Sequence, residues 1–143
     1  MKEDEIAELM RKRQPIWEAL STLYLDQDLQ EDDYQRIILQ IWNKGFTLTE
    51  LKEIDLYEVF PTLYRNLLSS TGVWNGFKQA WLYDECRKNH ERRRDAGFRM
   101  VTSIKNMTWP WMRKKPWVEI EKRWPETLAY KTIDLNRRVS EEE

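Results

Sequence analysis

The segment QPIWEALSTLYLD, residues 14–26, indicates most directly which fold the chain adopts. Ile16, Trp17, Leu20 and Tyr24 recur in it at spacings of three and four residues. This periodicity places the four side chains on one face of an α-helix, where a neighbouring element can cover them. The segment therefore predicts a helix with one buried face.

The same pattern continues on both sides of this segment. The chain has only 4 Gly and 5 Pro among its 143 residues, which favours helices. Gly45 suits the left-handed end of a helix, and Thr47 with Glu50 matches a capping box. Pro15 suits the first turn of the helix quoted above. Residues 127–135 are the only segment whose sequence is compatible with a short strand. Further helices are expected over residues 3–13, 34–44, 56–68, 77–94, 96–106 and 118–123.

These elements predict an all-α fold, a compact bundle of about five to seven helices with a Trp-rich C-terminal segment. The length suits one domain, expected over residues 1–130 with a loose tail over 131–143. The first residues are too charged for a signal peptide, and no apolar run is long enough for a membrane span. The single cysteine rules out an intrachain disulfide. A cytoplasmic protein that does not enter a membrane is expected.

Tryptophan is unusually frequent, with 8 residues in the chain. Aromatic side chains of this size bury well, so Trp17, Trp42, Trp74 and Trp81 are expected in the core. The tryptophans from residue 107 onward alternate with proline and basic residues. Their pattern is compatible with either a core or an interface.

The charges are divided along the chain. Residues 1–86 contain 9 Lys and Arg against 16 Asp and Glu, whereas residues 87–143 contain 15 against 9. Such asymmetry bears on binding partners rather than on the fold. The cations of one half can also simply pair with the acids of the other half.

The basic half suits a nucleic-acid-binding module, in which cations contact phosphates and tryptophans stack on bases. The acidic half and the isoelectric point near 6.0 argue against this function, which stands as the alternative. Its candidate contacts are Arg92, Arg93, Arg94, Arg113, Lys114, Lys115 and Trp111.

Signatures of catalysis and of metal binding are weak. Cys86 and His90, the only histidine, stand four residues apart and could share a helix face, but no third residue is seen to orient them. The acidic residues 26–33 lack the glycine and the closing glutamate of a calcium loop. No catalytic residue, metal site or cofactor is therefore expected.

Three motifs carry a resemblance to a known group of proteins. They are residues 16–26, EVFP at 58–61 with NLL at 66–68, and GVWNGF at 72–77 followed by Trp81. Together they resemble a family of small bacterial all-helical domains without an assigned activity, similar to the immunity proteins that accompany secreted toxins. The resemblance implies a compact helical domain and no catalytic residue. Within the motifs, Glu58 is expected to be partly buried and paired with a cation.

The function expected from these observations is non-catalytic protein binding. An immunity protein would neutralise a cognate toxin, here of the cationic kind that acts on nucleic acid, by covering its active site with an acidic surface. The acidic residues expected to bind this partner are Asp26, Asp28, Glu31, Asp32, Asp33, Glu50 and Glu53, with Asp55 beside the last two.

Overall fold

The computed structural model describes residues 2–24, 28–68, 79–108, 110–125 and 137. Over these residues the fold is all-α, as predicted, and no strand occurs among them. The elements in chain order are α1 (Glu3–Ser21), the 3₁₀ turn η1 (Thr22–Tyr24), α2 (Glu31–Ile41), α3 (Leu48–Ile54), the π-helical turn η2 (Asp55–Val59), α4 (Phe60–Leu68), α5 (Gln79–Arg92), α6 (Ala96–Thr108) and α7 (Trp111–Lys122). Residues 127–135, which were compatible with a short strand, and the expected tail at 131–143 lie outside the described residues, apart from residue 137.

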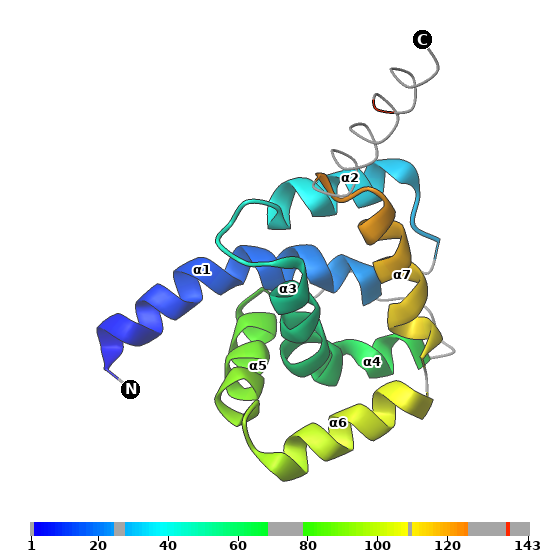
Figure 1. Cartoon of the computed structure of the whole chain (residues 1–143). Helices are drawn as coiled ribbons and strands as arrows, with labels where there is room; N and C mark the ends of the chain where they lie inside the picture. The colour runs from blue at the N-terminus through cyan, green and yellow to red at the C-terminus, as the bar shows by residue number, and fades with distance from the viewer. Residues whose placement is uncertain (1, 25–27, 69–78, 109, 126–136, 138–143) are drawn as a thin grey trace.

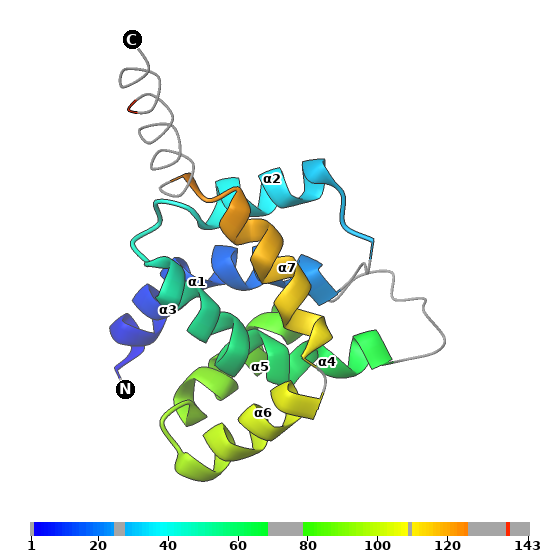
Figure 2. The same ribbon diagram turned by 45° about the vertical axis from the view of Figure 1, so that its right-hand side comes forward.

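The C-terminal half of α1 runs through the middle of the molecule (Figure 1). It contacts α2, α5 and η2, and α7 packs beside α2 and η1. The N-terminal half of α1 extends away from the body, and α6 lies along the edge opposite α2 in both views (Figures 1 and 2). The chain therefore surrounds one central helix, and α6 is a peripheral element.

The core follows the apolar faces read from the sequence. Trp17, Leu20 and Tyr24 are fully buried, together with Phe60 of α4. Trp117 and Trp124 are buried too, so these two members of the C-terminal tryptophan group belong to the core.

Two of the tryptophans expected in the core are exposed instead. Trp42 is 37% exposed and Trp81 is 41% exposed, so these predictions were wrong. Trp42 follows the last residue of α2 with an extended backbone, which takes it off the buried helix face. In α5 the buried face includes Leu82, so the preceding residue, Trp81, points to one side of it. Trp74 lies outside the described residues.

Several predicted helix ends were also wrong. Helix α1 continues through Pro15, because the residues after the proline pack into the core and compensate for the backbone hydrogen bond that it lacks. Helix α2 begins earlier than expected, with Gln30 as its N-cap and Asp33 closing the capping box. The break between α5 and α6 falls before Asp95, whose carboxylate accepts a hydrogen bond from the Phe98 amide, and not at Gly97. Helix α7 begins at Trp111, ahead of the predicted start.

Candidate binding site

Two buried carboxylates lie on the π-helical turn η2, between α3 and α4. Asp55 is 0% exposed and Glu58 is 1% exposed. Turns of this kind occur inside helices rarely and often at functional sites. The sequence predicted a helix over residues 56–68, and η2 ends at Val59, two residues before Pro61 in the first turn of α4.

Asp55 is surrounded by three donors. Its Oδ1 accepts a hydrogen bond from the Tyr24 hydroxyl at 2.8 Å. Its Oδ2 accepts from Arg113 Nε and from Trp117 Nε1, each at 2.8 Å. Burial is the largest cause that raises the pKa of Tyr24, and the negative charge of Asp55 raises it further. Asp55 thus ties α7 to the core, and the expectation that it belongs to an acidic surface was wrong.

Glu58 is paired with cations, as predicted. Arg13 Nη1 lies 3.2 and 3.1 Å from its two carboxylate oxygens, and Trp17 Nε1 donates to Oε1 at 2.9 Å. On the other side, Nδ1 of His90 lies 3.6 Å and Nη1 of Arg93 lies 3.9 Å from Oε2. Each of the two carboxylates therefore accepts hydrogen bonds from one tryptophan and one arginine.

A cleft of about 330 Å³ opens above Glu58, between α3, η2 and the corner that joins α5 to α6. We call it the Glu58 cleft. Its walls also contain the rings of Phe46 and Tyr57. The charged residues that line it, besides Glu58, are Arg13, Glu50, Glu53, Arg93, Arg94 and Arg99.

One wall of the cleft continues into α6, which exposes an apolar stripe. Met100, Val101, Ile104 and Met107 are 51–77% exposed, and we call them the α6 face. Thr102 is the one buried residue of this helix. Contacts on the other side of α6 are made by polar groups, which include the Arg99 guanidinium 4.1 Å from the centre of the Tyr57 ring. The helix therefore packs on the body through its polar side and turns its apolar side outward.

The acidic residues predicted to bind a partner are divided between two places. Glu50 and Glu53 line the Glu58 cleft, whereas those of residues 28–33 lie at the start of α2. Within α2, Asp33 Oδ2 accepts a hydrogen bond from the Gln30 amide, and both Asp28 and Asp32 are exposed. Asp26 lies outside the described residues. The structure therefore does not gather these acids on one surface.

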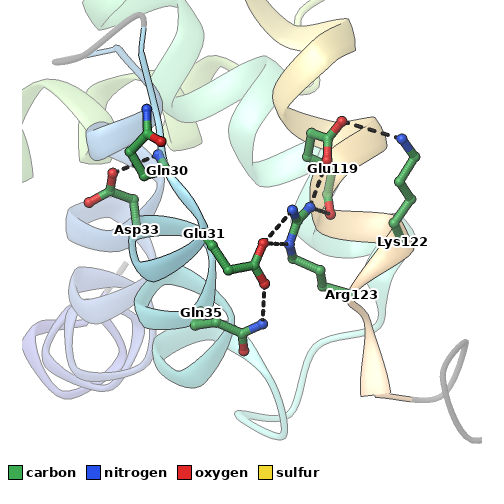
Figure 3. A network of polar contacts seen from close by, with 7 residues as sticks. All are labelled: Gln30, Glu31, Asp33, Gln35, Glu119, Lys122 and Arg123. Atoms are coloured by element: carbon green, nitrogen blue, oxygen red, sulfur yellow. Dashed lines mark hydrogen bonds and ion pairs between the residues drawn. The ribbon is translucent and has the colours of Figure 1, made fainter.

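Glu31 is engaged in a network between α2 and α7. Figure 3 shows Arg123 between Glu31 and Glu119, with its Nε 2.8 Å from Glu31 Oε2 and its Nη1 2.7 Å from Glu119 Oε2. Gln35 donates a further hydrogen bond to Glu31. These hydrogen bonds lower the pKa of Glu31 to about 2, and the one from Arg123 has the largest effect. Pairing between the acidic and basic halves, one of the two interpretations of the charge division, is confirmed here and at Asp55.

The residues predicted to contact nucleic acid are likewise divided. Arg92, Arg93 and Arg94 lie at the end of α5, while Lys114 and Lys115 lie in α7 beyond the far end of α6. The 13 residues of α6 correspond to about 20 Å. The guanidinium of Arg113 is held by Asp55 inside the protein, and the side chain of Trp111 is outside the described part of the chain.

Cys86 and His90 do not form an activated pair. Burial is the largest cause that raises the pKa of the Cys86 thiol, and the charge of Glu58 raises it further. A nucleophilic thiol needs a lowered pKa instead. His90 is buried too, and its Nδ1 has no hydrogen-bond partner among the residues that the structure describes. Among the described residues no cluster of side chains is suited to hold a metal ion, and no helix is long and apolar enough to cross a membrane.

The sequence did not identify the cleft or the α6 face. The spacing of Met100, Ile104 and Met107 signals an apolar stripe, but a stripe normally predicts a buried face. Arg13 and Tyr57 carry no local motif, and only the tertiary fold places them beside Arg99.

A comparison with known proteins identifies a family for this chain. No curated protein and no solved structure matches it. A family described as a domain of unknown function (DUF7079) matches residues 11–123, which include all the helices described above except the first turns of α1. The chain therefore belongs to the DUF7079 family.

Proposed function

We propose that this chain is a non-catalytic protein-binding protein whose partner docks on the α6 face. The observation that supports the proposal is the outward-facing apolar stripe of Met100, Val101, Ile104 and Met107. Monomeric proteins seldom leave contiguous apolar patches in water, and such patches mark interaction sites. Anchors at positions i, i+4 and i+7 of one helix are the arrangement by which a helix binds a groove.

The energetics are adequate for specific binding. Complete burial of a Val, Leu, Ile or Met side chain contributes about 1.5–3 kcal/mol. Four such side chains give a gross contribution of several kcal/mol, part of which offsets the entropy lost on association.

The surroundings of the buried ionisable groups also support a binding role. Asp55 and Glu58 are already saturated with donors from the protein itself. The thiol of Cys86 is buried and hard to ionise. These groups are arranged to stabilise the fold, which leaves the surface as the place where function is exerted.

Within this proposal the partner is a bacterial toxin domain, and the chain acts in the cytoplasm as its immunity protein. The motifs at residues 16–26, 58–61 and 72–77 support this class by their resemblance to such proteins. Asp28 and Asp32 remain exposed at the start of α2 and provide acidic groups toward a cationic partner. A toxin that docks on the α6 face would have its active site covered, while Asp28 and Asp32 would steer its approach.

The test is affinity capture with the tagged full chain from the organism that encodes it. The variant Ile104→Asp/Met107→Asp places two charges on the α6 face. Leu39→Asp is the matched control, because Leu39 is 70% exposed on α2. One protein should be recovered in equal amount with the wild-type chain and with Leu39→Asp, and lost with the double variant. Circular dichroism checks that all three are folded.

Two results would contradict the proposal. One is recovery of the same partner by the double variant, because binding would then use another surface. The other is recovery of nucleic acid that high salt removes, with no protein, because that is the behaviour of the alternative function.

A further inference from the structure

We infer that the Glu58 cleft binds a small dipolar molecule that carries a carboxylate and an ammonium group, the chemistry of a free amino acid. This site is separate from the α6 face and does not depend on the protein-binding proposal. The inference rests on the charges of the two walls, on the rigidity of the floor and on the size of the cleft.

The two walls of the cleft carry opposite charges. Glu50 and Glu53 come from α3, whereas Arg93, Arg94 and Arg99 come from the corner between α5 and α6. No ion pair joins these acids to these arginines among the described residues. Opposite charges that face each other without contact leave room for a ligand that carries both a positive and a negative group.

Two of these groups have no partner of their own. Arg94 and Glu53 are both exposed, and neither makes a hydrogen bond or an ion pair within the part of the chain that the structure describes. A guanidinium binds a carboxylate through two parallel hydrogen bonds, and a carboxylate accepts from an ammonium group. A ligand carboxylate would therefore bind at Arg94, and the ligand ammonium group would bind at Glu53.

The floor and the neighbouring wall are fixed before any ligand binds. Arg13 is held by Glu58 and lies 5.3 Å from the centre of the Phe46 ring. Arg99 donates a hydrogen bond to the Arg93 carbonyl at 3.1 Å and stacks on the Tyr57 ring. Groups held in this way lose little conformational entropy on binding, which is the advantage of preorganisation.

The size of the cleft and the signs of the charges on its walls limit the class of ligand that it can bind. Its volume of about 330 Å³ is at the lower end for ligand sites, and it corresponds to about ten water molecules. A ligand of amino-acid size fits this space. A simple anion would be attracted by the arginines but repelled by Glu50 and Glu53, so a dipolar molecule is favoured over phosphate.

The experiment is a titration of the ¹⁵N-labelled full chain, followed by backbone amide and arginine Nε–H signals. The probes are L-leucine, L-glutamine, L-glutamate and L-lysine. For each, the Nα-acetyl derivative removes the α-ammonium group and the α-amide removes the α-carboxylate. Inorganic phosphate serves as the simple anion. At least one amino acid should give saturable shifts around the cleft, and both of its derivatives should bind about tenfold more weakly or worse.

Variants assign the two ends of the ligand. Arg94→Gln and Glu53→Gln should each weaken binding of that amino acid about tenfold, because each loses a charge-assisted hydrogen bond. The matched controls Arg36→Gln and Asp32→Asn change exposed residues of α2 and should leave binding unchanged. Unchanged amide spectra away from the site show that each variant is folded.

Three results would overturn the inference. They are the absence of saturable shifts with all four amino acids, equal binding of an amino acid and its N-acetyl derivative, and phosphate binding that is as tight and is unaffected by Glu53→Gln. The second and third would assign the cleft to simple anions.

Discussion

Replacement of Asp55 by asparagine tests whether η2 ties α7 to the core through a buried charge. The asparagine oxygen can still accept from Trp117 or Arg113, and its amide group can donate to the Tyr24 oxygen. The shape of the side chain is thus kept, and the change removes chiefly the negative charge. Arg113, whose side chain is 12% exposed, then has no anion beside it.

The expected loss follows from the desolvation of that arginine. Breaking a buried ion pair by neutralising one partner typically costs about 3–5 kcal/mol. For a chain of this length the melting temperature should fall by about 10–15 °C. Tyr24→Phe keeps the charge of Asp55 and removes the hydrogen bond that the Tyr24 hydroxyl donates to it, so it should cost less, about 1 kcal/mol. Asp32→Asn, on an exposed residue, should stay within about 0.5 kcal/mol.

The assay is urea unfolding followed by circular dichroism, extended to a double-mutant cycle with Arg113→Met. Removal of both charges leaves no unpaired ion, so the double variant should be more stable than the sum of the single losses predicts. The reasoning is refuted if Asp55→Asn costs less than about 1 kcal/mol. It is also refuted if the two losses are additive, because the pair would then be uncoupled.

Three further predictions concern pH, thiol chemistry and backbone strain. The folded-state pKa of Glu31 is lowered to about 2 from 4.5, so its contribution to stability is complete above 4.5 and is lost as the pH falls toward 2. Urea midpoints measured across that range should fall more for the wild-type chain than for Glu31→Gln. The Cys86 thiol should react with a disulfide reagent slowly in the folded protein and rapidly in urea, and fast reaction of the folded protein would argue against its burial. Gly45→Ala should cost about 1 kcal/mol in urea unfolding, because Gly45 has a φ of 90° that an alanine rarely adopts. Nothing lies within 4 Å of the added methyl group, so an unchanged midpoint would mean that the turn relaxes.

The parts of the fold that the sequence predicted well depend on short-range signals. The capping box of Thr47 and Glu50 is present, with the Thr47 hydroxyl accepting from the Glu50 amide at 3.1 Å. The left-handed Gly45 is present too. Pro15 shows where such signals fail, because burial of the residues after it outweighs the local cost of a proline within a helix. The prediction for Trp42 failed because α2 ends one residue before it.

The candidate site was less predictable because its residues are brought together over long distances in the chain. Arg13 meets Glu58 across 45 residues, and Arg123 meets Glu31 across 92. A composition count records these charges but does not show that they neutralise each other. The outward orientation of the α6 face is a further property of the tertiary fold, since the same stripe on a buried helix would read identically in the sequence.

These pairings change the meaning of the charge division between the two halves. Had the acids of the first half faced solvent together, their field would steer a cationic partner over long distances. Instead Glu31, Asp55 and Glu58 each lie beside an arginine from the second half: Arg123, Arg113 and Arg93, respectively. The opposite charges of the two halves thus serve largely to join α7 and the α5–α6 corner to the core. In the described part of the chain, the α6 face and the unpaired Arg94 and Glu53 are available for recognition, so specificity should depend more on apolar contact than on net charge.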